Sequence, residues 1–461
     1  MSTIIKPVNR ERTFLIDELF FSTTNLKGII ETGNDVFVRV SGHPIESLIG
    51  APHNIIRHPD MPRAVFRLLW DYLEAGKSFA GYVKNMARDG SYYWVMALLV
   101  PKEKGYLSVR FKPSGPYFAA AREIYAEMLA LENAGLDAER AGAKAVDWRE
   151  RMTRAGERMT ELLRAKGFES YDRFMQTAIA DEMTARRAQL GAKARPAAGG
   201  TAAANTSADE NLLAAERLFV GVDERLDDLF AHVASLLDLV DRLNQRSLQL
   251  NSLSRDIKTV SLNGVIASNR LGEAGRGLSV VTQALTSVSG ESTASIARIS
   301  VELGALGALT HELAFAITAA KLQAEMTLFF IREIAAGEGG GQTSATIQSD
   351  IETLRRTLAQ SLEKIIAMMP SASAATTELM RSNERLYDSL RQLSRIRITG
   401  KVQASYINDA GYFQTLFDDV YARLESAAAQ LEEVTSAAAL LKHEIPSMTR
   451  TGEQVQRALA A

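Results

Sequence analysis

The chain has no cysteine among its 461 residues. Disulfide bonds, thiolate metal sites and cysteine nucleophiles are therefore excluded, and the composition suits a reducing compartment. The chain also lacks a charge imbalance, because 53 basic side chains stand against 55 acidic ones. This balance predicts no nucleic-acid partner, since such proteins carry clustered basic residues.

Targeting signals and uninterrupted apolar runs are missing as well. The first twenty residues show no basic-then-apolar signal pattern. The most apolar long window, residues 305–334, is interrupted by Glu312, Lys321, Glu325, Arg332 and Glu333. A membrane-spanning helix needs about 20 mostly apolar residues. We therefore expect a soluble, cytoplasmic protein without a membrane span, and its length predicts two or three domains.

Strand patterns occupy the first part of the chain. Residues 24–42 (TNLKGIIETGNDVFVRVSG) predict a strand, a glycine turn, a second strand and a short helix. In residues 79–101, β-branched and aromatic residues flank Asp89-Gly90, which predicts a hairpin. Residues 105–113 (GYLSVRFKP) supply another strand. Residues 1–116 are thus predicted to form an α+β domain with an antiparallel sheet and short helices.

The remaining chain is predicted to be helical. A helical connector is expected over 117–190, a flexible linker poor in large apolar residues over 191–210, and an all-α helical bundle over 211–461. Residues 337–342 (GEGGGQ), Pro370 and residues 397–401 (RITGK) are expected to divide the last part. Apolar residues between Leu226 and Val240 recur every three or four positions and require a partner helix. On periodicity alone, this region is a plain helical bundle.

The segment PHNIIRHPDMP, residues 52–62, combines rigidity with polar groups. Pro59 and Pro62 fix the backbone and lower the entropy cost of holding Arg57, His58 and Asp60 in one arrangement. Arginine offers a donor fork for phosphate, while histidine and aspartate suit a ribose or a polar ring edge. Flat apolar walls for a planar cofactor could come from downstream residues. These are Phe79, Tyr82, Tyr92, Tyr93 and Trp94, with Asn85 among them.

Structural explanations of the same residues remain open. The turn equally fits a helix cap, and the aromatic residues equally fit a sheet and its core. No metal site is expected, because His53 and His58 lie five residues apart without a further ligand at suitable spacing.

Residues 14 to about 112 resemble the PAS sensor domain of bacterial aerotaxis receptors. The resemblance rests on residues 22–42, 46–70 (ESLIGAPHNIIRHPDMPRAVFRLLW) and 81–101 (GYVKNMARDGSYYWVMALLVP). It implies non-covalently bound FAD whose redox state is sensed. It also implies flavin-binding roles for Arg57, His58 and Asp60, and places Asn34, Asn85, Tyr93 and Trp94 in the cofactor region. Phe79 stands where this family commonly has tryptophan. Other PAS domains hold haem or no cofactor.

A glycine-rich segment, residues 261–281 (SLNGVIASNRLGEAGRGLSVV), interrupts the helical pattern. Its glycines favour a tight reversal between antiparallel helices, with Glu273 and Arg276 bracing the turn. A phosphate-binding loop is disfavoured, because no strand precedes the segment and the P-loop lysine is missing. Residues 262–281 resemble the hairpin tip of methyl-accepting chemotaxis receptors, which contacts a histidine kinase and its coupling protein. The matching tip residues are Asn263, Arg270, Gly272, Glu273, Gly275, Arg276 and Gly277. The chain departs from that pattern at Gly264, Ala267, Asn269 and Leu271.

Residues 428–437 (AAQLEEVTSA) fit the methylation-site pattern of the same receptors, with Glu432 and Glu433 as the acceptors. An alanine-rich helix also produces this pattern by chance.

Together these resemblances predict a non-enzymatic aerotaxis or redox-sensing transducer. In it, a flavin-binding PAS domain controls a coiled-coil signalling region that acts as a homodimer or higher oligomer. The alternative is an oligomeric scaffold whose PAS domain binds a protein without a cofactor. A flavin-dependent enzyme is disfavoured, since no catalytic acid–base group was identified.

Overall fold

The computed structural model describes residues 5–140, 147–192, 207–337, 344–407 and 411–461. These residues form two compact units. The first comprises residues up to 230 together with 314–364 and 453–461, and the second comprises 231–313 and 365–452.

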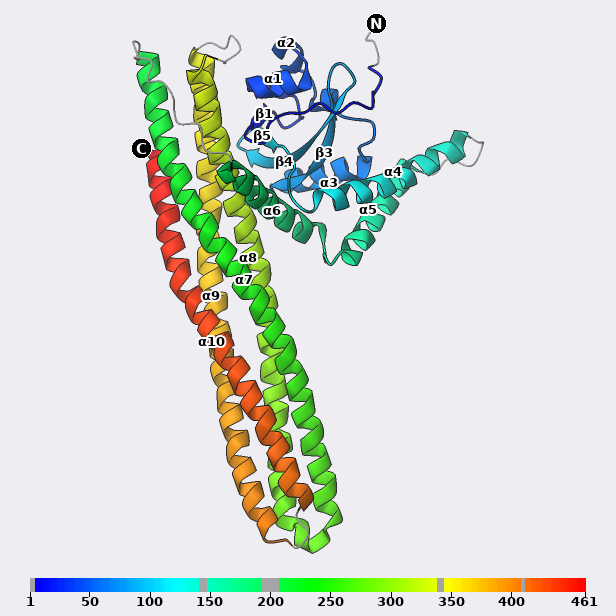
Figure 1. Cartoon of the computed structure of the whole chain (residues 1–461), viewed down its shortest axis with the longest axis vertical. Helices are drawn as coiled ribbons and strands as arrows, with labels where there is room; N and C mark the ends of the chain where they lie inside the picture. The colour runs from blue at the N-terminus through cyan, green and yellow to red at the C-terminus, as the bar shows by residue number, and fades with distance from the viewer. Residues whose placement is uncertain (1–4, 141–146, 193–206, 338–343, 408–410) are drawn as a thin grey trace. The chain divides into compact units, whose positions relative to one another are not determined.

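The first unit contains a five-stranded antiparallel sheet (Figure 1). Its strands are β1 (Phe20–Thr24), β2 (Ile30–Gly33), β3 (Phe79–Met86), β4 (Tyr92–Lys102) and β5 (Gly105–Phe111), in the order β2-β1-β5-β4-β3. The predicted Asp89-Gly90 hairpin is confirmed, with Gly90 at φ 84° in the turn between β3 and β4. The predicted α+β fold with an antiparallel sheet is therefore confirmed.

Short helices pack on one face of the sheet, the face that carries the side chains of Phe20, Asn85 and Arg110. They are α1 (Asp35–Ser41), α2 (Ile45–Leu48), the 3₁₀ helix η1 (His53–Ile56) and α3 (Arg63–Glu74). The proline-rich turn that the sequence singled out includes η1 and ends at Pro62, the N-cap of α3. Proline suits the start of a helix because its φ is fixed near the helical value. It also lacks a backbone N–H, which would have no partner within the helix at this position. The turn therefore leads directly into a helix without a capping side chain of its own, and it also forms part of a cavity wall.

Longer helices pack against the other face of the sheet and against α3. The connector consists of α4 (Phe118–Arg140), α5 (Trp148–Ala165) and α6 (Tyr171–Ala192). Parts of α8 (Arg276–Ala335) and α9 (Ser344–Ser405) join the same hydrophobic core through Phe330 and Leu354. The ring of Phe21 in β1 lies edge-on to Phe330, with 5.1 Å between ring centroids. Because both faces are covered, every residue of β5 is buried.

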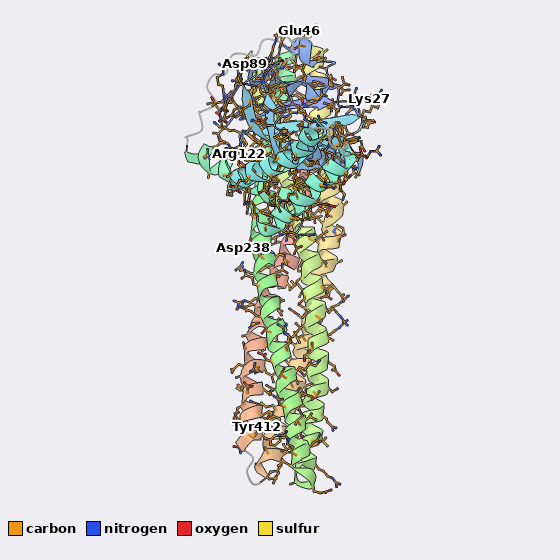
Figure 2. All side chains as sticks on the ribbon, turned by 90° about the vertical axis from the view of Figure 1, so that its right-hand side faces the viewer. Lys27, Glu46, Asp89, Arg122, Asp238 and Tyr412 are labelled. Carbon is orange, nitrogen blue, oxygen red and sulfur yellow. The ribbon has the colours of Figure 1, made fainter. Side chains whose placement is uncertain are left out.

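The second unit is a bundle of four helical segments. They belong to α7 (Ser207–Arg270), α8, α9 and α10 (Gly411–Ala460). Leu250, Ile296, Leu386 and Ala427, one from each helix, line a common gap at the centre. Charged residues such as Asp238 project outward (Figure 2). The apolar stripe of α7 thus finds partner helices within its own chain.

Two predicted helix breaks are wrong. Residues 397–401 do not form a hinge, because α9 continues to Ser405. Gly400 instead permits close packing, since a Cβ atom there would lie 2.2 Å from the ring of Phe417. Pro370 lies inside α9 at an exposed position. A proline removes only one helical hydrogen bond, so bundle packing tolerates it there.

Other predicted boundaries fall partly on residues outside those described. The linker predicted over 191–210 is shortened at its ends, because α6 extends to Ala192 and α7 begins at Ser207, while 193–206 are not described. The break expected at 337–342 agrees with the end of α8 at Ala335 and the start of α9 at Ser344, with 338–343 not described.

The glycine-rich segment forms the predicted reversal. Gly272–Gly275 is a 3₁₀ turn between α7 and α8, and Gly272 has a positive φ of 57°. Gly275 is buried, and a Cβ atom there would lie 2.2 Å from the carbonyl oxygen of Ser268. Glu273 and Arg276 form the expected ion pair, with 2.7 Å between Oε1 and Nη2. The other predicted tip residues, Asn263, Arg270 and Gly277, are exposed.

One helix bears on the expected absence of a membrane span, which stays a prediction. Within the described residues, Gly272–Ala335 is long and apolar enough, because an 18-residue window in it contains at most two charged residues. Of that window, 67% is buried inside the protein. Burial of this extent is typical of a core helix, which satisfies the same test.

The close packing at Gly400 generates a stability prediction. Gly400→Ala should destabilise the bundle by roughly 1–3 kcal/mol, because the added methyl group collides with Phe417. The matched control is Gly290→Ala in α8, where no atom lies within 4 Å of the new Cβ. This change should stabilise the helix by up to about 1 kcal/mol. Urea unfolding followed by helical circular dichroism measures both, and equal effects would contradict the packing explanation.

Candidate functional site

A cavity of about 250 Å³ lies within the N-terminal domain. Residues of β3, β4 and β5 form its floor, α3 and η1 form its sides, and the β1–β2 turn contributes Lys27 and Gly28. The lining comprises Thr24, Lys27, Gly28, Pro52, His53, Asn54, Arg57, Phe66, Leu69, Trp70, Leu73, Val83, Asn85, Ala97, Leu99, Tyr106, Ser108 and Arg110.

Three polar atoms on the cavity floor are buried and have no hydrogen-bond partner in the described part of the chain. They are Asn85 Nδ2, Ser108 Oγ and Arg110 Nη1. Each of these residues is at most 4% exposed. An unsatisfied buried polar group costs about 1–3 kcal/mol, and more if charged. Three of them around one cavity indicate a ligand or ordered water that accepts hydrogen bonds there.

Arg110 is also a buried cation that has no counterion among the residues that the structure describes. Its Nη2 donates to Ser22 Oγ at 3.0 Å and lies 2.5 Å from His53 Nε2, which therefore acts as an acceptor. Burial lowers the pKa of Arg110 to about 10, so that the guanidinium remains protonated at neutral pH. Burial and the Arg110 charge together hold the pKa of His53 well below its usual value, so His53 is neutral. None of the described residues that line the cavity is acidic.

Aromatic rings form the apolar part of the wall. Trp70 lies edge-on to Tyr106, with 5.7 Å between centroids, and the guanidinium of Arg57 lies 4.1 Å from the centre of the Phe66 ring. Gly28, with φ at 71°, allows the main chain to approach Trp70, because a Cβ atom there would lie 3.0 Å from the indole. The combination of flat apolar walls and few polar groups is typical of a small-molecule site.

Two of the predicted cofactor residues line this cavity. Arg57 and Asn85 do so, and a backbone bridge joins them. His58 and Asp60 face elsewhere: His58 Nδ1 accepts from the Asp60 amide at 3.1 Å, while the exposed Asp60 carboxylate pairs with Lys84 at 2.6 Å. Burial and the Lys84 charge lower the pKa of His58.

The remaining predicted cofactor residues do not line the cavity either. The ring of Phe79 stacks on Tyr171 of α6 at 5.5 Å, and that of Trp94 lies edge-on to Phe118 of α4 at 5.4 Å. Tyr93 is fully buried, and burial raises its pKa. Asn34 is the N-cap residue of α1.

Three polar cavity residues, Arg110, Ser108 and His53, were not predicted as ligand-binding. The signal was present in GYLSVRF, where Tyr106, Ser108 and Arg110 alternate along one face of a strand. An arginine in a strand usually faces solvent, so the alternation indicates a site only once both faces are known to be buried.

Three carboxylates from helices outside the sheet bind backbone amides of the domain. Glu132 of α4 accepts from Arg63 N and Ala64 N at the start of α3, at 2.8 and 3.0 Å. Glu182 of α6 accepts from Ser114 N and Gly115 N at 2.6 and 2.7 Å. Carboxylates are favourable at such unpaired amides, especially at a helix start.

Glu333 of α8 is the third of these carboxylates. It accepts from Val36 N in the first turn of α1 at 3.2 Å and from Asn34 Nδ2 at 3.0 Å. Glu182 in addition accepts from the hydroxyl of Tyr82 in β3 at 2.8 Å. The neighbouring residue in that strand, Val83, lines the cavity. The sheet that forms the cavity floor is thereby hydrogen-bonded to α6.

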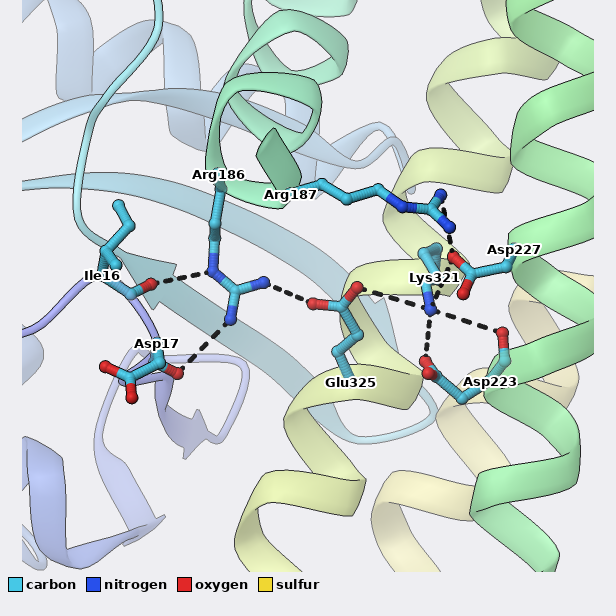
Figure 3. Close-up of polar contacts among 8 residues, drawn as sticks. All are labelled: Ile16, Asp17, Arg186, Arg187, Asp223, Asp227, Lys321 and Glu325. Carbon is cyan, nitrogen blue, oxygen red and sulfur yellow. Dashed lines mark hydrogen bonds and ion pairs between the residues drawn. The ribbon is translucent and has the colours of Figure 1, made fainter. Parts of the chain in front are cut away.

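An ion network around the buried side chains of Arg186 and Lys321 connects α6, α7 and α8 (Figure 3). Arg186 of α6 donates to Glu325 of α8 at 2.5 Å and to the carbonyls of Ile16 and Asp17. Lys321 Nζ lies 2.6, 3.0 and 3.4 Å from carboxylate oxygens of Asp223, Asp227 and Glu325. Arg187 pairs with Asp227 at 3.2 Å.

Three cations therefore meet three carboxylates in this network. Burial lowers the pKa of Lys321, but the surrounding carboxylates outweigh it, so the pKa is raised overall. Burial raises the pKa of Asp223. Removing a carboxylate partner of buried Lys321 is destabilising, because its desolvated charge then loses compensation.

The predicted methylation residues lie on α10. Glu432 and Glu433 are both exposed, and Glu433 pairs with Arg246 of α7 at 2.6 Å. Their modification stays a prediction.

The neutral state of half-buried His53 generates a pH prediction. Its pKa is lower in the folded than in the unfolded state, so its contribution to stability is present above pH 6.5 and is lost as the pH falls towards the folded pKa. Lowering the pH from 7.5 to 5.5 should therefore cost about 1 kcal/mol more in the parent protein than in His53→Gln. Tryptophan-detected urea unfolding measures this, with the exposed His443→Gln as control. An identical pH dependence in parent and His53→Gln would contradict the assignment.

The N-terminal part of the chain is similar to known proteins. Residues 30–104 match the family model described as the PAS fold. A stretch of 124 residues is 41% identical to the aerotaxis receptor of Escherichia coli strain K12, covering 26% of this chain and 24% of that receptor. The crystal structure of a PAS domain from Colwellia psychrerythraea is similar at 22% identity and a TM-score of 0.18, covering 20% of this chain and 85% of that one. The chain thus carries an N-terminal PAS domain that is related in sequence to an aerotaxis receptor and is joined to a long helical region.

Proposed function

We propose that this protein is a signal transducer whose PAS domain binds a flavin in the 250 Å³ cavity and controls the helical region. The observation that carries the proposal is the set of three buried, unpartnered polar atoms, Asn85 Nδ2, Ser108 Oγ and Arg110 Nη1, on the cavity floor. Relatedness to an aerotaxis receptor supports a sensory role.

The residues present fit a flavin ring. The edge of such a ring carries carbonyl oxygens and ring nitrogens, which accept the hydrogen bonds that Arg110, Asn85 and Ser108 can donate. Its flat faces suit walls made of Phe66, Trp70 and Tyr106. When bound, a flavin supplies a redox-dependent change of charge and protonation. The unpaired Arg110 cation would favour whichever form of the ligand carries negative charge.

A haem is less well supported by the same residues. His53 is the only imidazole among the described cavity residues, and its Nε2 already lies against Arg110 and Ser22 at 2.5 and 3.2 Å. Serving as an axial ligand through that atom would require the loss of both contacts.

Transmission to the helices is proposed to follow the hydrogen bonds described above. Asn85 and Tyr82 lie on opposite faces of β3, so a shift of this strand reaches both the cavity and Glu182. Glu182 and Arg186 are four residues apart and share one face of α6. Arg186 in turn binds Glu325 of α8. We propose that the helices have two arrangements, and that the state of the ligand shifts the balance between them through the contacts of Glu182, Arg186 and Glu325.

The helical region is proposed to act through contacts with other proteins in the cytoplasm, without catalysing a reaction. Its exposed tip residues, among them Asn263, Arg270 and Glu273, form the surface proposed to meet a chemotaxis kinase and coupling protein. Association into homodimers or higher oligomers is also proposed. The sequence match covers only 24% of the receptor. The proposal of these partners therefore depends on the resemblance of residues 262–281 to the receptor tip.

The first experiment is an absorption spectrum of the purified protein before and after reduction. Two bands in the blue and near-ultraviolet that bleach on reduction are expected. A sharp Soret band would show that the bound ligand is haem and would overturn the flavin proposal. A colourless protein that stays colourless after incubation with FAD would overturn the sensor and favour the scaffold alternative.

Arg110→Met separates ligand binding from stability. Loss of a charged hydrogen-bond donor should weaken flavin binding by about ten- to a hundredfold. The ligand-free protein should at the same time become equally or more stable, because a desolvated cation without a counterion disappears. Equilibrium titration and urea unfolding give the two values. The control is Arg122→Met, whose guanidinium lies 5.7 Å from the Phe118 ring. Unchanged flavin affinity in Arg110→Met would refute its role.

Glu325→Gln tests the transmission route. Amide hydrogen exchange in residues 314–335 should differ between the oxidised and reduced flavin-loaded parent protein. In Glu325→Gln this difference should vanish there while persisting in β3. Glu291→Gln, an exposed change on the same helix, should behave like the parent. Persistence of the difference in Glu325→Gln would show that transmission bypasses this ion pair.

A further inference from the structure

The outward face of α9 changes character near its C-terminal end. The charged and exposed residues on this face are Glu384, Asp388, Arg391 and Arg395. At the same spacing of three or four residues, Ile398, Val402 and Tyr406 follow, with exposed fractions of 54%, 49% and 79%. A bundle helix normally presents polar residues to solvent. A continuous apolar row of this kind therefore indicates a surface that another molecule covers.

The packing of α9 inside the bundle fixes the direction of this row. Gly400 and Ala404 are buried, and a Cβ atom at Gly400 would lie 2.2 Å from the ring of Phe417 in α10. Ile398 and Val402 are two residues away from these positions, which is about 200° around the helix. Their side chains therefore point away from the core, in agreement with their exposure.

Two contacts with α10 hold this end of α9 in place. The guanidinium of Arg397 lies 4.1 Å from the centre of the Tyr421 ring, and Lys401 pairs with Asp418. The cations beside the outward face are thus already engaged within the chain. Because the helix is fixed before a partner arrives, the entropy cost of docking on its outward face is lowered.

The outward face is self-complementary in one orientation. We call Arg391, Arg395, Ile398, Val402 and Tyr406 the α9 row; its first half is cationic and its second half is apolar. If two copies run antiparallel with a two-fold axis beside Ile398, Arg391 lies opposite Tyr406 of the partner subunit, and Arg395 lies opposite Val402 of the partner subunit. A guanidinium is attracted to the face of an aromatic ring, and its aliphatic stem packs on apolar surface. Parallel pairing would set each arginine against its own copy, and the like charges would repel.

We propose that a second copy of this chain docks antiparallel on the α9 row. The bundle core is filled by four helical segments of one chain, so the second copy adds to the outer face. The row spans about 23 Å, given the rise of a helix per residue. A contact of this length belongs to the small end of specific interfaces, so a dissociation constant in the micromolar range is expected. The contact rests on the association of copies proposed above, and it does not depend on the ligand of the PAS domain.

Sedimentation velocity of the full chain over a hundredfold range of concentration tests this contact. The parent chain is expected to shift from monomer to dimer as the concentration rises. Ile398→Lys should weaken the association at least tenfold, because it places two new cations side by side at the two-fold axis. The matched control is Val301→Lys, because Val301 is a 73% exposed valine of α8 in the same bundle but outside the row. This variant should associate like the parent.

Single cysteines test the antiparallel orientation, because the chain has none of its own. Ile398→Cys should form a disulfide-linked dimer when oxidised glutathione is added, since the two copies of this position meet at the axis. Tyr406→Cys should give little of this product, because its two copies lie at opposite ends of the contact. Val301→Cys measures the background from chance collisions.

The outcomes separate this contact from the other proposals. Equal dimerisation of the parent and Ile398→Lys would overturn the α9 row and leave the association of copies in place through another surface. Equal cross-linking of Ile398→Cys and Tyr406→Cys would overturn antiparallel docking. A parent chain that stays monomeric at every concentration would overturn both the row and the association, and would leave the outward face of α9 to a different protein. The absorption spectrum reports flavin binding independently of all these results.

Discussion

The carboxylate of Glu182 is the contact on which the arrangement of the N-terminal domain depends. It is fully buried and accepts hydrogen bonds from Tyr82 in β3 and from the amides of Ser114 and Gly115 after β5. Burial raises its pKa, while these donors act in the opposite direction. One side chain of α6 thereby fixes the edge strand and the exit from the sheet together. A buried carboxylate is tolerated only when its hydrogen bonds are made, so these elements are held in a defined geometry.

The fold followed from local sequence more readily than the site did. The hairpin of β3 and β4 could be predicted from the β-branched and aromatic residues around Asp89-Gly90. Both the turn type and the two-residue period of a strand depend only on residues close in sequence. Arg57 and Asn85 were predicted at the ligand site and do line the cavity. Arg110 was missed, because its burial depends on helices that cover both faces of β5. The helix breaks predicted at Pro370 and at 397–401 do not occur, because packing in the bundle outweighs the low helix propensity of these residues.

The bundle shows how a long apolar stripe can be buried within one chain. In the second unit, α7 and α8 are joined at the glycine-rich turn, and the segments of α9 and α10 complete a shared core. Contacts between helices distant in sequence support this, as Arg246 pairs with Glu433 and Asp256 with Arg423. The core of this bundle is therefore closed without a second copy. Any association of copies would use exposed residues, and would add to the bundle instead of completing it.

The bond between Asn34 and Glu333 has a consequence for synthesis of the chain. These residues are 299 positions apart, yet Glu333 supplies acceptors to Asn34 and to the first turn of α1. At a translation rate of about 5–20 residues per second, roughly 15–60 seconds separate their appearance on the ribosome. Glu132 and Glu182 arrive earlier in the same process. The sheet can thus assemble first, whereas α1 receives its last hydrogen-bond partner only when most of the chain has been made.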